Sequence, residues 1–476
     1  MANNREFIDI ARQGHSYRPT EERRKDWKEV EVLPHPKEIV NQSHRCMDCG
    51  VPYCMSQSGC PLGNLIPEWN LNLQSGDLES AWAALEETNN FPEITGRLCP
   101  APCESACVAG KDGDPVSIRA IEQSLADQAF ANNWIRPQAP RQRLNSRVAI
   151  IGSGPAGLSA GQQLNRLGHS VTIFEKSPEP GGLLRFGIPD FKYDKSLLNQ
   201  RIAQLVDEGI EFQCGTEVGR DISLSDLNRR FHALGLALGA EQARDLNIPG
   251  RHLSGIHLAM DFLVQQNIAN SKKSSPHQNP ISALNKTVVV IGGGDTGSDC
   301  VGTAIRQGAK SVLQLEMLPR PPKNRSSRTP WPQWPMKLRS SHAHEEGGQR
   351  QWSLSTQEFL GDSKGQIRAL RVVDLSTDET LREIPNSMRE IPADLVLIAI
   401  GFAGPKEQGI LSDLGLQLDP HSRPLTRNYQ TSIAHVFAGG DMRRGQSLIV
   451  WAINEGRMMA NSIHHYLKTC KNPNLV

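Results

Sequence analysis

Hydrophobic and polar positions follow two different patterns on either side of about residue 140. Upstream, apolar residues recur at helical spacing in Leu78–Glu87 and Ile118–Ala131, which predicts amphipathic helices. From Arg147 onward, short apolar runs, glycine-rich turns and helical segments alternate, which is typical of βαβ units. This second pattern occurs at Arg147–Glu175 and again at Lys286–Glu316. We therefore predict a helical region followed by two α/β folds.

The first glycine-rich turn has the features of a dinucleotide site. Gly152 permits the tight turn, Gly154 lets the backbone approach a pyrophosphate, and Gly157 lets helix and strand pack closely. Glu175 ends the next apolar run, where an acid hydrogen-bonds ribose hydroxyls. The turn between the glycines also contains Pro155 and Ala156. The glycines alone would be weak evidence, but together with the strand, the helix and the terminal acid they predict a nucleotide site much more specifically.

A second turn repeats this arrangement. Gly292, Gly294 and Gly297 stand at the same spacing, and Glu316 ends the following apolar run. The residues that open the second helix are Asp295 and Thr296. Two dinucleotide sites in one chain suggest bound FAD and an exchangeable NADH or NADPH, placed for hydride transfer.

Near the end of the chain, Gly440 and Asp441 follow an apolar run and precede a helical segment. An aspartate at such a turn can hydrogen-bond a ribityl hydroxyl of a flavin, although by itself it is equally suited to cap a helix. The first glycine motif favours the flavin interpretation.

The choice of nicotinamide cofactor stays open. Glu316 favours NADH because an acid at that position grips the ribose diol and repels a 2′-phosphate. Four basic residues follow it and could bind that phosphate, or form a solvated loop: Arg320, Lys323, Arg325 and Arg328.

Seven of the ten cysteines cluster before the first glycine turn, at Cys46, Cys49, Cys54, Cys60, Cys99, Cys103 and Cys107. Zinc is one candidate ligand, because a pair such as Cys46 and Cys49 is a common half-site. Iron–sulfur chemistry is favoured by the prolines after Cys60 and Cys99, and because a flavin fed by hydride needs a one-electron outlet. Two all-cysteine clusters need eight thiolates, so seven imply either one cluster or a non-cysteine ligand.

Several segments resemble the small (beta) subunit of glutamate synthase over essentially the whole chain. They are Cys46-Met-Asp-Cys49-Gly-Val-Pro-Tyr-Cys54, Gly59-Cys60-Pro-Leu-Gly-Asn-Leu-Ile-Pro-Glu-Trp69, Asn90-Phe-Pro-Glu-Ile-Thr-Gly-Arg97-Leu-Cys99-Pro-Ala-Pro-Cys103 and Trp331-Pro-Gln-Trp-Pro. The resemblance implies two [4Fe–4S] clusters with interleaved ligands. Cys46, Cys49, Cys54 and Cys107 would hold one; Cys60, Cys99, Cys103 and Glu122 would hold the other. It also implies that Gly182 and Arg185 contact FAD.

The resemblance further implies the reaction. Such a subunit oxidises NAD(P)H at FAD and passes electrons through the clusters to a large (alpha) subunit, where glutamine and 2-oxoglutarate give glutamate. No catalytic side chain is expected on this chain, because hydride passes between bound cofactors. Two alternatives use the same motifs: a related oxidoreductase subunit serving ferredoxin or another reductive partner, and a zinc-stabilised nucleotide-sensing protein without turnover.

Length and composition set the domain count and the partners. At roughly 150 residues per domain, 476 residues predict about three domains. The net charge of +1 argues against a nucleic-acid partner, and no apolar run approaches the ~18 residues of a membrane helix. With no apolar signal segment at the start, a cytoplasmic location is expected.

The expected fold class is α/β, with two Rossmann-like domains after a helical iron–sulfur domain. The expected segments are 1–140 for the iron–sulfur domain, 146–284 and 395–476 for a discontinuous FAD domain, and 285–394 for the NAD(P)H domain. The FAD domain is divided because the Gly439–Asp441 turn must reach the first glycine motif. Pro330–Pro335 is expected to line the nicotinamide pocket or contact a partner, and His342 and His344 to lie in a solvent-facing loop.

Overall fold

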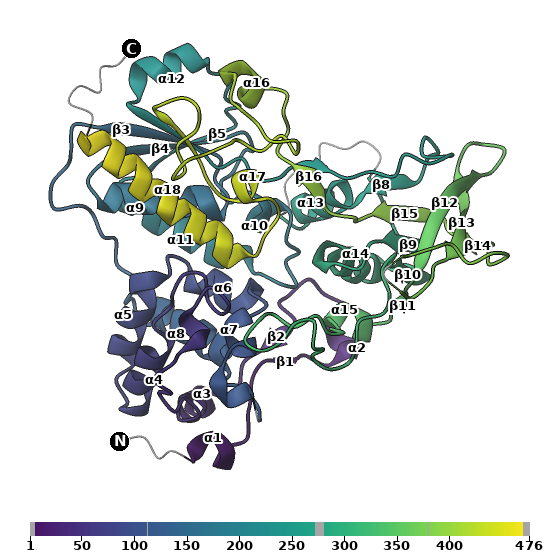
Figure 1. Cartoon of the computed structure of the whole chain (residues 1–476), viewed down its shortest axis with the longest axis horizontal. Helices are drawn as coiled ribbons and strands as arrows, with labels where there is room; N and C mark the ends of the chain where they lie inside the picture. The colour runs from purple at the N-terminus through teal and green to yellow at the C-terminus, as the bar shows by residue number, and fades with distance from the viewer. Residues whose placement is uncertain (1–4, 112, 272–279, 379, 470–476) are drawn as a thin grey trace.

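The computed structural model describes residues 5–111, 113–271, 280–378 and 380–469. It consists of a helical amino-terminal region, a first α/β fold above it and a second α/β fold beside both (Figure 1). No described helix combines the length and the apolar character that a membrane-spanning helix requires.

The amino-terminal region is almost entirely helical. Both helices predicted there are confirmed: α5 is Leu78–Thr88 and α8 is Ile118–Ala131. Asp77 caps α5 by accepting a hydrogen bond from the Ser80 N–H at 2.9 Å, and Ile121 and Leu125 of α8 are fully buried. The remaining elements are α1 Glu6–Asp9, β1 Ser16–Tyr17, α2 Thr20–Arg23, β2 Glu31–Val32, α3 Pro36–Ser43, η1 Tyr53–Met55, α4 Ile66–Gln74, α6 Pro92–Leu98, α7 Pro102–Ser105 and η2 Val108–Gly110.

The first α/β fold is a parallel sheet in the order β17-β6-β3-β4-β5. Its strands are β3 Arg147–Ile151, β4 Ser170–Glu175, β5 Glu211–Cys214, β6 Ala233–Leu236 and β17 Val436–Ala438. Its helices are α9 Pro155–Arg166, α10 Leu183–Phe186, α11 Lys195–Asp207, α12 Leu224–Arg230, α16 Ile410–Leu414, α17 Asp441–Arg444 and α18 Ile449–Thr469. The central strands are buried on both faces, as expected where helices cover a parallel sheet.

The end of the chain returns to this first fold, as the Gly439–Asp441 turn predicts. Strand β17 pairs with β6, and the long helix α18 lies across α9 (Figure 1). The two helices approach so closely that a Cβ on Gly456 would lie 2.2 Å from the Ala156 carbonyl oxygen. The Ser159 hydroxyl also donates to the Ile453 carbonyl at 3.0 Å.

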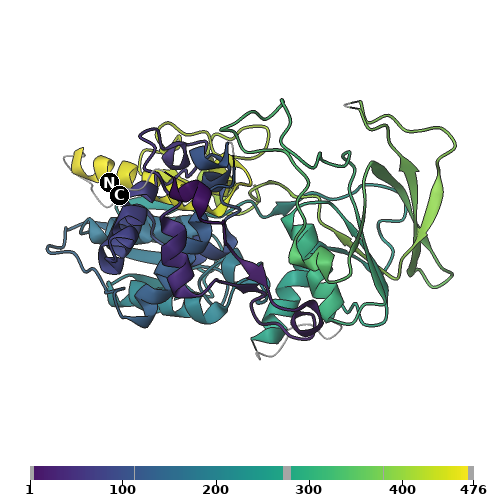
Figure 2. The same ribbon diagram turned by 90° about the horizontal axis from the view of Figure 1, so that it is seen from below.

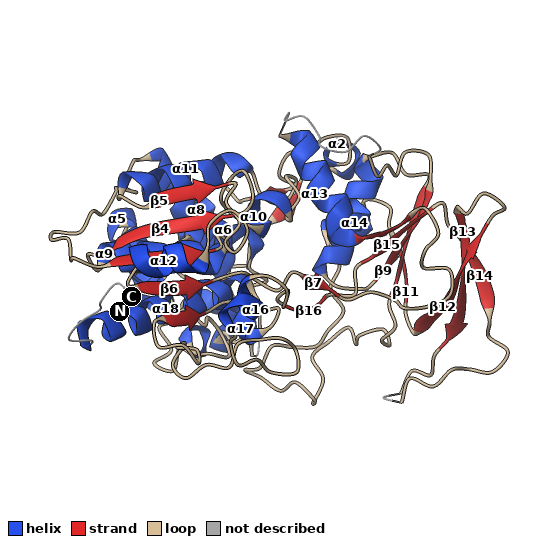
Figure 3. Cartoon of the chain, turned by 90° about the horizontal axis from the view of Figure 1, so that it is seen from above, coloured by secondary structure: helices blue, strands red, loops and turns tan. Residues whose placement is uncertain are grey.

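The second α/β fold has the parallel order β11-β10-β9-β15-β8. Its strands are β8 Ile256–Leu258, β9 Thr287–Ile291, β10 Ser311–Leu315, β11 Gln349–Gln351 and β15 Leu395–Ile398, and its helices are α13 Ala259–Asn270, α14 Asp295–Arg306 and α15 His342–Glu345. Beyond it lies the antiparallel sheet of β12 Leu354–Gly361, β13 Ile367–Asp374 and β14 Arg389–Pro392 (Figure 3).

The expected boundaries at 284 and 395 would assign β8 and β15 to the FAD domain, but both strands lie in the sheet of the second fold. Both belong to the second fold, because β15 pairs with β9 and β8 pairs with β15. The glycine motif and its terminal acid mark only β9 and β10, so the sequence pattern gives no sign of the strands that lie on the other side of β9. The chain crosses between the folds at the ribbon of β7 Gln242–Ala243 and β16 Phe402–Gly404.

The amino-terminal segment reaches across to the second fold, where α2 lies beside α15 (Figures 1 and 2). Glu346 accepts hydrogen bonds from Arg23 at 2.9 Å and from Arg306 of α14 at 2.6 Å. All three side chains are almost completely buried. This buried ion network joins the start of the chain to the second fold.

The prediction for the two histidines is wrong. His342 is 4% exposed and its Nδ1 lies 3.0 Å from Glu346 Oε1. His344 is half-buried and hydrogen-bonds the Gln314 side chain at 2.7 Å. The polar stretch forms the short helix α15, which Ser341 caps and which packs against α14, and that tertiary contact is invisible in the local sequence.

Candidate functional site

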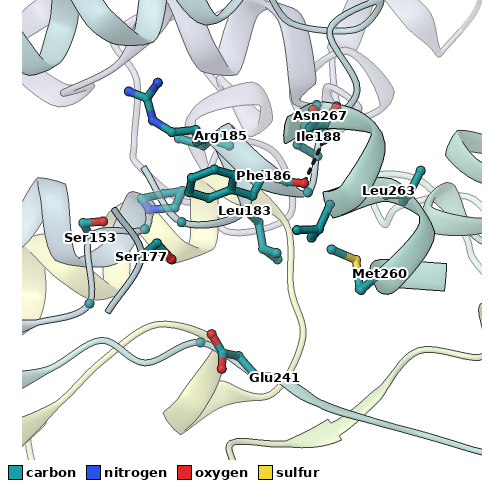
Figure 4. A pocket seen from close by; sticks show the side chains of 18 of the residues that line it. Ser153, Ser177, Leu183, Arg185, Phe186, Ile188, Glu241, Met260, Leu263 and Asn267 are labelled. Atoms are coloured by element: carbon teal, nitrogen blue, oxygen red, sulfur yellow. Dashed lines mark hydrogen bonds between the residues drawn. The ribbon is translucent and has the colours of Figure 1, made fainter. Parts of the chain in front are cut away.

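A cavity of about 2220 Å³ lies between the two α/β folds. Ser153, Ser177 and Arg185 line one side of it, and Met260, Leu263 and Asn267 of α13 line another (Figure 4). Asn267 ties the sides together by donating to the Phe186 and Ile188 carbonyls at 2.8 and 3.1 Å. Because pockets for single ligands are typically ~300–1,000 Å³, this volume is sufficient for more than one.

The first glycine turn forms a wall of this cavity, and its glycines are required sterically. A Cβ on Gly152 would lie 2.4 Å from the Ala237 carbonyl oxygen, and one on Gly157 would lie 1.9 Å from that of Gly152. Of the residues expected at FAD, eight line the cavity: Gly152, Gly154, Pro155, Ala156, Glu175, Gly182, Arg185 and Asp441. Gly157 and Gly440 are not among the lining residues.

Glu175 holds the first turn in shape. Its carboxylate accepts hydrogen bonds from the Ser153 N–H at 3.1 Å and from the Ser177 N–H at 2.8 Å. The following loop closes over the turn, because a Cβ on Gly182 would lie 2.9 Å from the Gly154 Cα. Arg185 is fixed by donating to the Pro180 carbonyl at 2.6 Å, and it is ion-paired with Glu179 at 2.9 Å.

Asp441 faces the same cavity from the end of the chain. Burial raises the pKa of its carboxyl to about 6, although the Ser447 hydroxyl donates to it at 2.8 Å. The first residues of α18 and the turn before it, including Ser447 and Ile449, also line the cavity. The returning segment therefore completes the wall that the first fold begins.

The second glycine turn has the same internal geometry in a different setting. A Cβ on Gly292 would lie 2.2 Å from the Ala399 carbonyl oxygen, and one on Gly297 would lie 2.3 Å from that of Gly292. Glu316 accepts from the Gly293 N–H at 2.7 Å and from the Leu318 N–H at 3.0 Å. Of the residues expected at NAD(P)H, Asp295 and Thr296 line the cavity, and Gly292, Gly294, Gly297, Glu316, Arg320 and Arg325 do not.

The two candidate arginines beyond Glu316 have different environments. Arg325 points to the amino-terminal region, where it donates to the Ser105 carbonyl at 3.0 Å. Arg320 lies over the Trp352 ring, with its guanidinium carbon 5.1 Å from the ring centroid. Arg350 of β11 lies at the same distance from that ring. Arg350 could not be singled out from the sequence, because only the pairing of β11 with β10 brings it near the end of the nucleotide motif.

The thiols of the amino-terminal region form two groups. Burial raises the pKa of Cys54, and the neighbouring thiols of Cys107, Cys46 and Cys49 raise it further. These four cysteines are therefore close enough to interact electrostatically, and they are the same four residues as the first expected ligand set. Burial also raises the pKa of Cys46, to about 11.

Cys60, Cys99, Cys103 and Glu122 surround a second, small cavity and form the second expected set. Burial raises the pKa of Glu122 to about 7, even though Thr95 and Asn89 hydrogen-bond its carboxylate, Asn89 at 2.9 Å. In the part of the chain that the structure describes, no three His, Cys, Asp or Glu side chains converge tightly enough to hold a single metal ion. Soft thiolates in sets of this size suit iron–sulfur clusters.

The second ligand set adjoins the large cavity. Leu98 and Pro100, on either side of Cys99, line the large cavity. Val450 of α18 lines the small cavity, while its neighbour Ile449 lines the large one. The proline after Cys99 was expected at an iron–sulfur site, but nothing in the sequence indicated that Leu98 and Pro100 would line the large cavity, because that position depends on how the helical region docks on the first fold.

The tryptophan–proline segment 330–335 does not line the large cavity among the described residues. The Trp331 ring instead packs edge-on against Tyr53 of η1, with 4.9 Å between the ring centroids, and Lys111 lies 5.8 Å from the Trp331 ring centroid. The loop therefore connects the second fold to the part of the helical region that carries Cys54.

Comparison with known proteins agrees with this arrangement. Residues 23–134 match the family described as dihydropyrimidine dehydrogenase domain II, 4Fe-4S cluster, and residues 146–456 match the pyridine nucleotide-disulphide oxidoreductase family. The structure of Mycobacterium tuberculosis FprA in complex with NADPH superposes with a TM-score of 0.56 and 20% identity, covering 69% of this chain and 86% of that one. At this level of identity, the likeness shows that the two proteins share a fold and shows no more than that.

Two curated relatives match nearly the whole sequence. The glutamate synthase [NADPH] small chain of Mycobacterium tuberculosis is 49% identical, over 94% of this chain and 93% of that protein. The glutamate synthase [NADH] of Schizosaccharomyces pombe is 44% identical over 96% of this chain, which corresponds to 22% of that longer protein. On this evidence the chain belongs to the glutamate synthase small-chain family and is an oxidoreductase with an iron–sulfur domain and a pyridine-nucleotide domain.

Proposed function

We propose that this chain is the electron-input subunit of a glutamate synthase. It oxidises NADPH at FAD and delivers electrons through two [4Fe–4S] clusters to a large subunit, which converts glutamine and 2-oxoglutarate to glutamate. The observation that carries this proposal is the large cavity between the two α/β folds. It is lined by the first glycine turn, by the start of α14 in the second fold, and by Leu98 and Pro100 beside Cys99.

Residues of this chain would position the flavin and the nicotinamide cofactor relative to each other. When bound, FAD accepts two electrons as hydride and releases them one at a time. The first glycine turn, Glu175 and Asp441 would hold it in the cavity, and Asp295 and Thr296 would orient the nicotinamide cofactor toward it. We assign the domain boundaries from the sheet to which each strand belongs. The first flavin-binding segment ends at about β7 and the second begins at about β16, and the nicotinamide-binding fold lies between them.

We infer a direction for electron flow from the positions of the two thiol sets. The second set adjoins the cavity through Cys99, whereas Cys46 and Cys49 of the first set are only partly buried. Electrons would therefore enter at Cys60, Cys99, Cys103 and Glu122 and leave from the first set toward the large subunit.

NADPH is the proposed donor. Arg320 and Arg350 place two guanidinium groups beside one ring near the end of β10, and no described carboxylate forms an ion pair with either. Two such cations suit a 2′-phosphate. Arg325 is not included, because its hydrogen bond to the Ser105 carbonyl directs it toward the amino-terminal region. Arg350 also donates hydrogen bonds, to the Arg339 carbonyl and the Ser340 hydroxyl, but both of these groups precede α15 in the second fold.

Anaerobic reduction of the purified full chain tests this function. We expect about eight iron atoms and one FAD per chain for two four-iron clusters, flavin bleaching on addition of NADPH, and glutamate formation only when the large subunit is added. A colourless chain that binds zinc and no flavin would contradict the proposal. If the chain is coloured and is reduced by NADPH but forms no glutamate with the large subunit, the proposed redox chemistry would stand and the proposed partner would be wrong.

A further inference from the structure

Arg45 is a buried cation beside the first thiol set. Its side chain is 2% exposed and it directly precedes Cys46 in the chain. The guanidinium donates to the backbone carbonyls of Ile10 and, at 2.6 Å, Asp114, and its Nε has no hydrogen-bond partner. A buried charge normally needs a charged partner, so this arrangement requires an explanation.

The charged groups around Arg45 do not neutralise it. Burial lowers the pKa of Arg45; Asp114 and the Cys107 thiol oppose that shift, and Arg12 adds to it. Asp114 is exposed and offers its backbone carbonyl for the hydrogen bond. Arg12 is itself ion-paired with Glu104 at 2.6 Å. The buried group within electrostatic reach of Arg45 is therefore Cys107, one of the expected cluster ligands, which would be a thiolate when it binds iron.

The second thiol set has the opposite charge balance. Arg119 lines the small cavity but is ion-paired with Glu31 at 2.8 Å. Glu104 also accepts a hydrogen bond from the Arg119 backbone N–H at 3.0 Å. Glu122 contributes a carboxylate to the set itself. The first set also has an acid beside it, Asp48, but that side chain is exposed to solvent. The first set thus lies beside a buried arginine and an exposed acid, and the second beside an ion-paired arginine and a buried acid.

We propose that Arg45 raises the reduction potential of the cluster held by Cys46, Cys49, Cys54 and Cys107 above that of the cluster held by the second set. A fixed positive charge lowers the energy of an added electron, and a buried one is screened only weakly by salt. The step is a one-electron transfer in which the second cluster is oxidised, the first is reduced, and no bond is made or broken. This inference rests on the proposed function, because it requires both clusters.

Potentiometric titration of the full chain, followed by electron paramagnetic resonance, tests the proposal with two variants of Arg45. Arg45→Gln removes the charge and keeps two donors, and we expect the higher of the two cluster midpoints to fall while the flavin midpoint stays unchanged. Arg45→Lys keeps the charge and should leave the midpoint close to that of the unaltered chain. Unchanged midpoints in the glutamine variant, or an equal fall in both variants, would overturn the role of the charge.

Asp114→Asn provides an independent test at an exposed position. Removing this carboxylate strengthens the net positive charge at Arg45, so we expect a small rise in the same midpoint, opposite in sign to Arg45→Gln. If the glutamine variant loses its cluster, this second measurement decides: a rise supports the proposal, and no rise overturns it. A chain that binds no iron in any form would instead refute the proposed function.

Discussion

The two dinucleotide folds share a motif but differ in how the protein covers it. In the first fold the glycine turn is buried or half-buried, and Glu175 is 6% exposed. In the second fold Gly293, Gly294 and Asp295 are exposed. The internal hydrogen bonds are equivalent, because each acid accepts from the N–H groups of its own turn and of the residue two positions further on.

The covering segments explain the difference. The Gly181–Arg185 loop closes over the first turn, and Asp441 and the start of α18 return from the end of the chain to the same cavity. In the described chain no equivalent returning segment covers the second turn. A buried site suits a cofactor that stays bound, and an open one suits a cofactor that is exchanged in every turnover. The comparison therefore supports FAD in the first fold and the exchangeable nicotinamide cofactor in the second.

The largest expected effect comes from the third glycine of each motif. Gly157→Ala would place a Cβ 1.9 Å from the Gly152 carbonyl oxygen, and Gly297→Ala would place one 2.3 Å from that of Gly292. Overpacking a core usually costs about 1–3 kcal/mol, and contacts this short with the backbone should cost more than that. We expect the first variant to lose its flavin, and the second to keep the flavin but lose reduction by NADPH, as measured by absorbance before and after addition of NADPH.

Gly14→Ala is the matched control, since its nearest neighbour would be 3.7 Å away. It should keep both flavin and reduction. Loss of flavin in both motif variants would mean that the two folds do not divide the cofactors as proposed.

The next effect concerns how the second fold is held. Burial alone would raise the pKa of Glu346, but hydrogen bonds from His342 and Arg306 outweigh it and lower the pKa to about 2. Its stabilisation is therefore complete above the ordinary value of 4.5 and is lost as the pH falls through about 2. Glu346→Gln removes the carboxylate from Arg306 and leaves Arg23 with only the half-exposed Glu345, and we expect a cost of about 3–5 kcal/mol in thermal unfolding.

Glu345→Gln is the control for that variant. Its carboxylate pairs with the same Arg23 at 2.9 Å but is 49% exposed, so we expect a loss below about 1 kcal/mol. Limited proteolysis should show the amino-terminal segment released in Glu346→Gln with flavin still bound. Equal destabilisation by the two variants would contradict the importance of the buried network.

A smaller effect distinguishes the nicotinamide cofactors. Arg320→Gln or Arg350→Gln removes one charged contact to a 2′-phosphate, worth about 1.5–3 kcal/mol, so KM for NADPH should rise roughly 10- to 100-fold. KM for NADH should not change, because NADH has no such group. Arg368→Gln, an exposed residue of β13 paired with Glu390, is the control. Parallel changes with both cofactors would show that the arginines act on folding and not on the phosphate.

The smallest effect is a pH slope in the first fold. The folded chain holds a proton on Asp441 up to about pH 6, whereas the unfolded chain releases it near 3.8. Stability of the flavin-free chain should therefore fall as the pH rises from about 4 to 6, by at most about 1.4 kcal/mol per pH unit from this group. Asp441→Asn should remove that part of the slope in thermal unfolding. A slope identical in the two proteins would show that this carboxyl is not buried as described.

Sequence patterns predicted the elements that local rules govern. The βαβ units at β3-α9-β4 and β9-α14-β10, and the helices α5 and α8, lie where periodicity and glycine spacing placed them. Contacts made by segments remote from the motifs could not be predicted in this way. Strand β15 joins the second sheet, Arg350 reaches the Trp352 ring, and His342 becomes buried.

The sequence by itself determined the two nucleotide turns, the number of thiols and the family, because glycine sterics and ligand chemistry act over a few residues. Only the tertiary structure decided which turn is covered, which arginine is left without a carboxylate, and which thiol set adjoins the cavity. Those properties depend on burial and electrostatics, and both are set by side chains that arrive from distant parts of the chain. Arg45 shows the distinction, because its position next to Cys46 is written in the sequence, whereas its lack of a neutralising partner appears only in the fold.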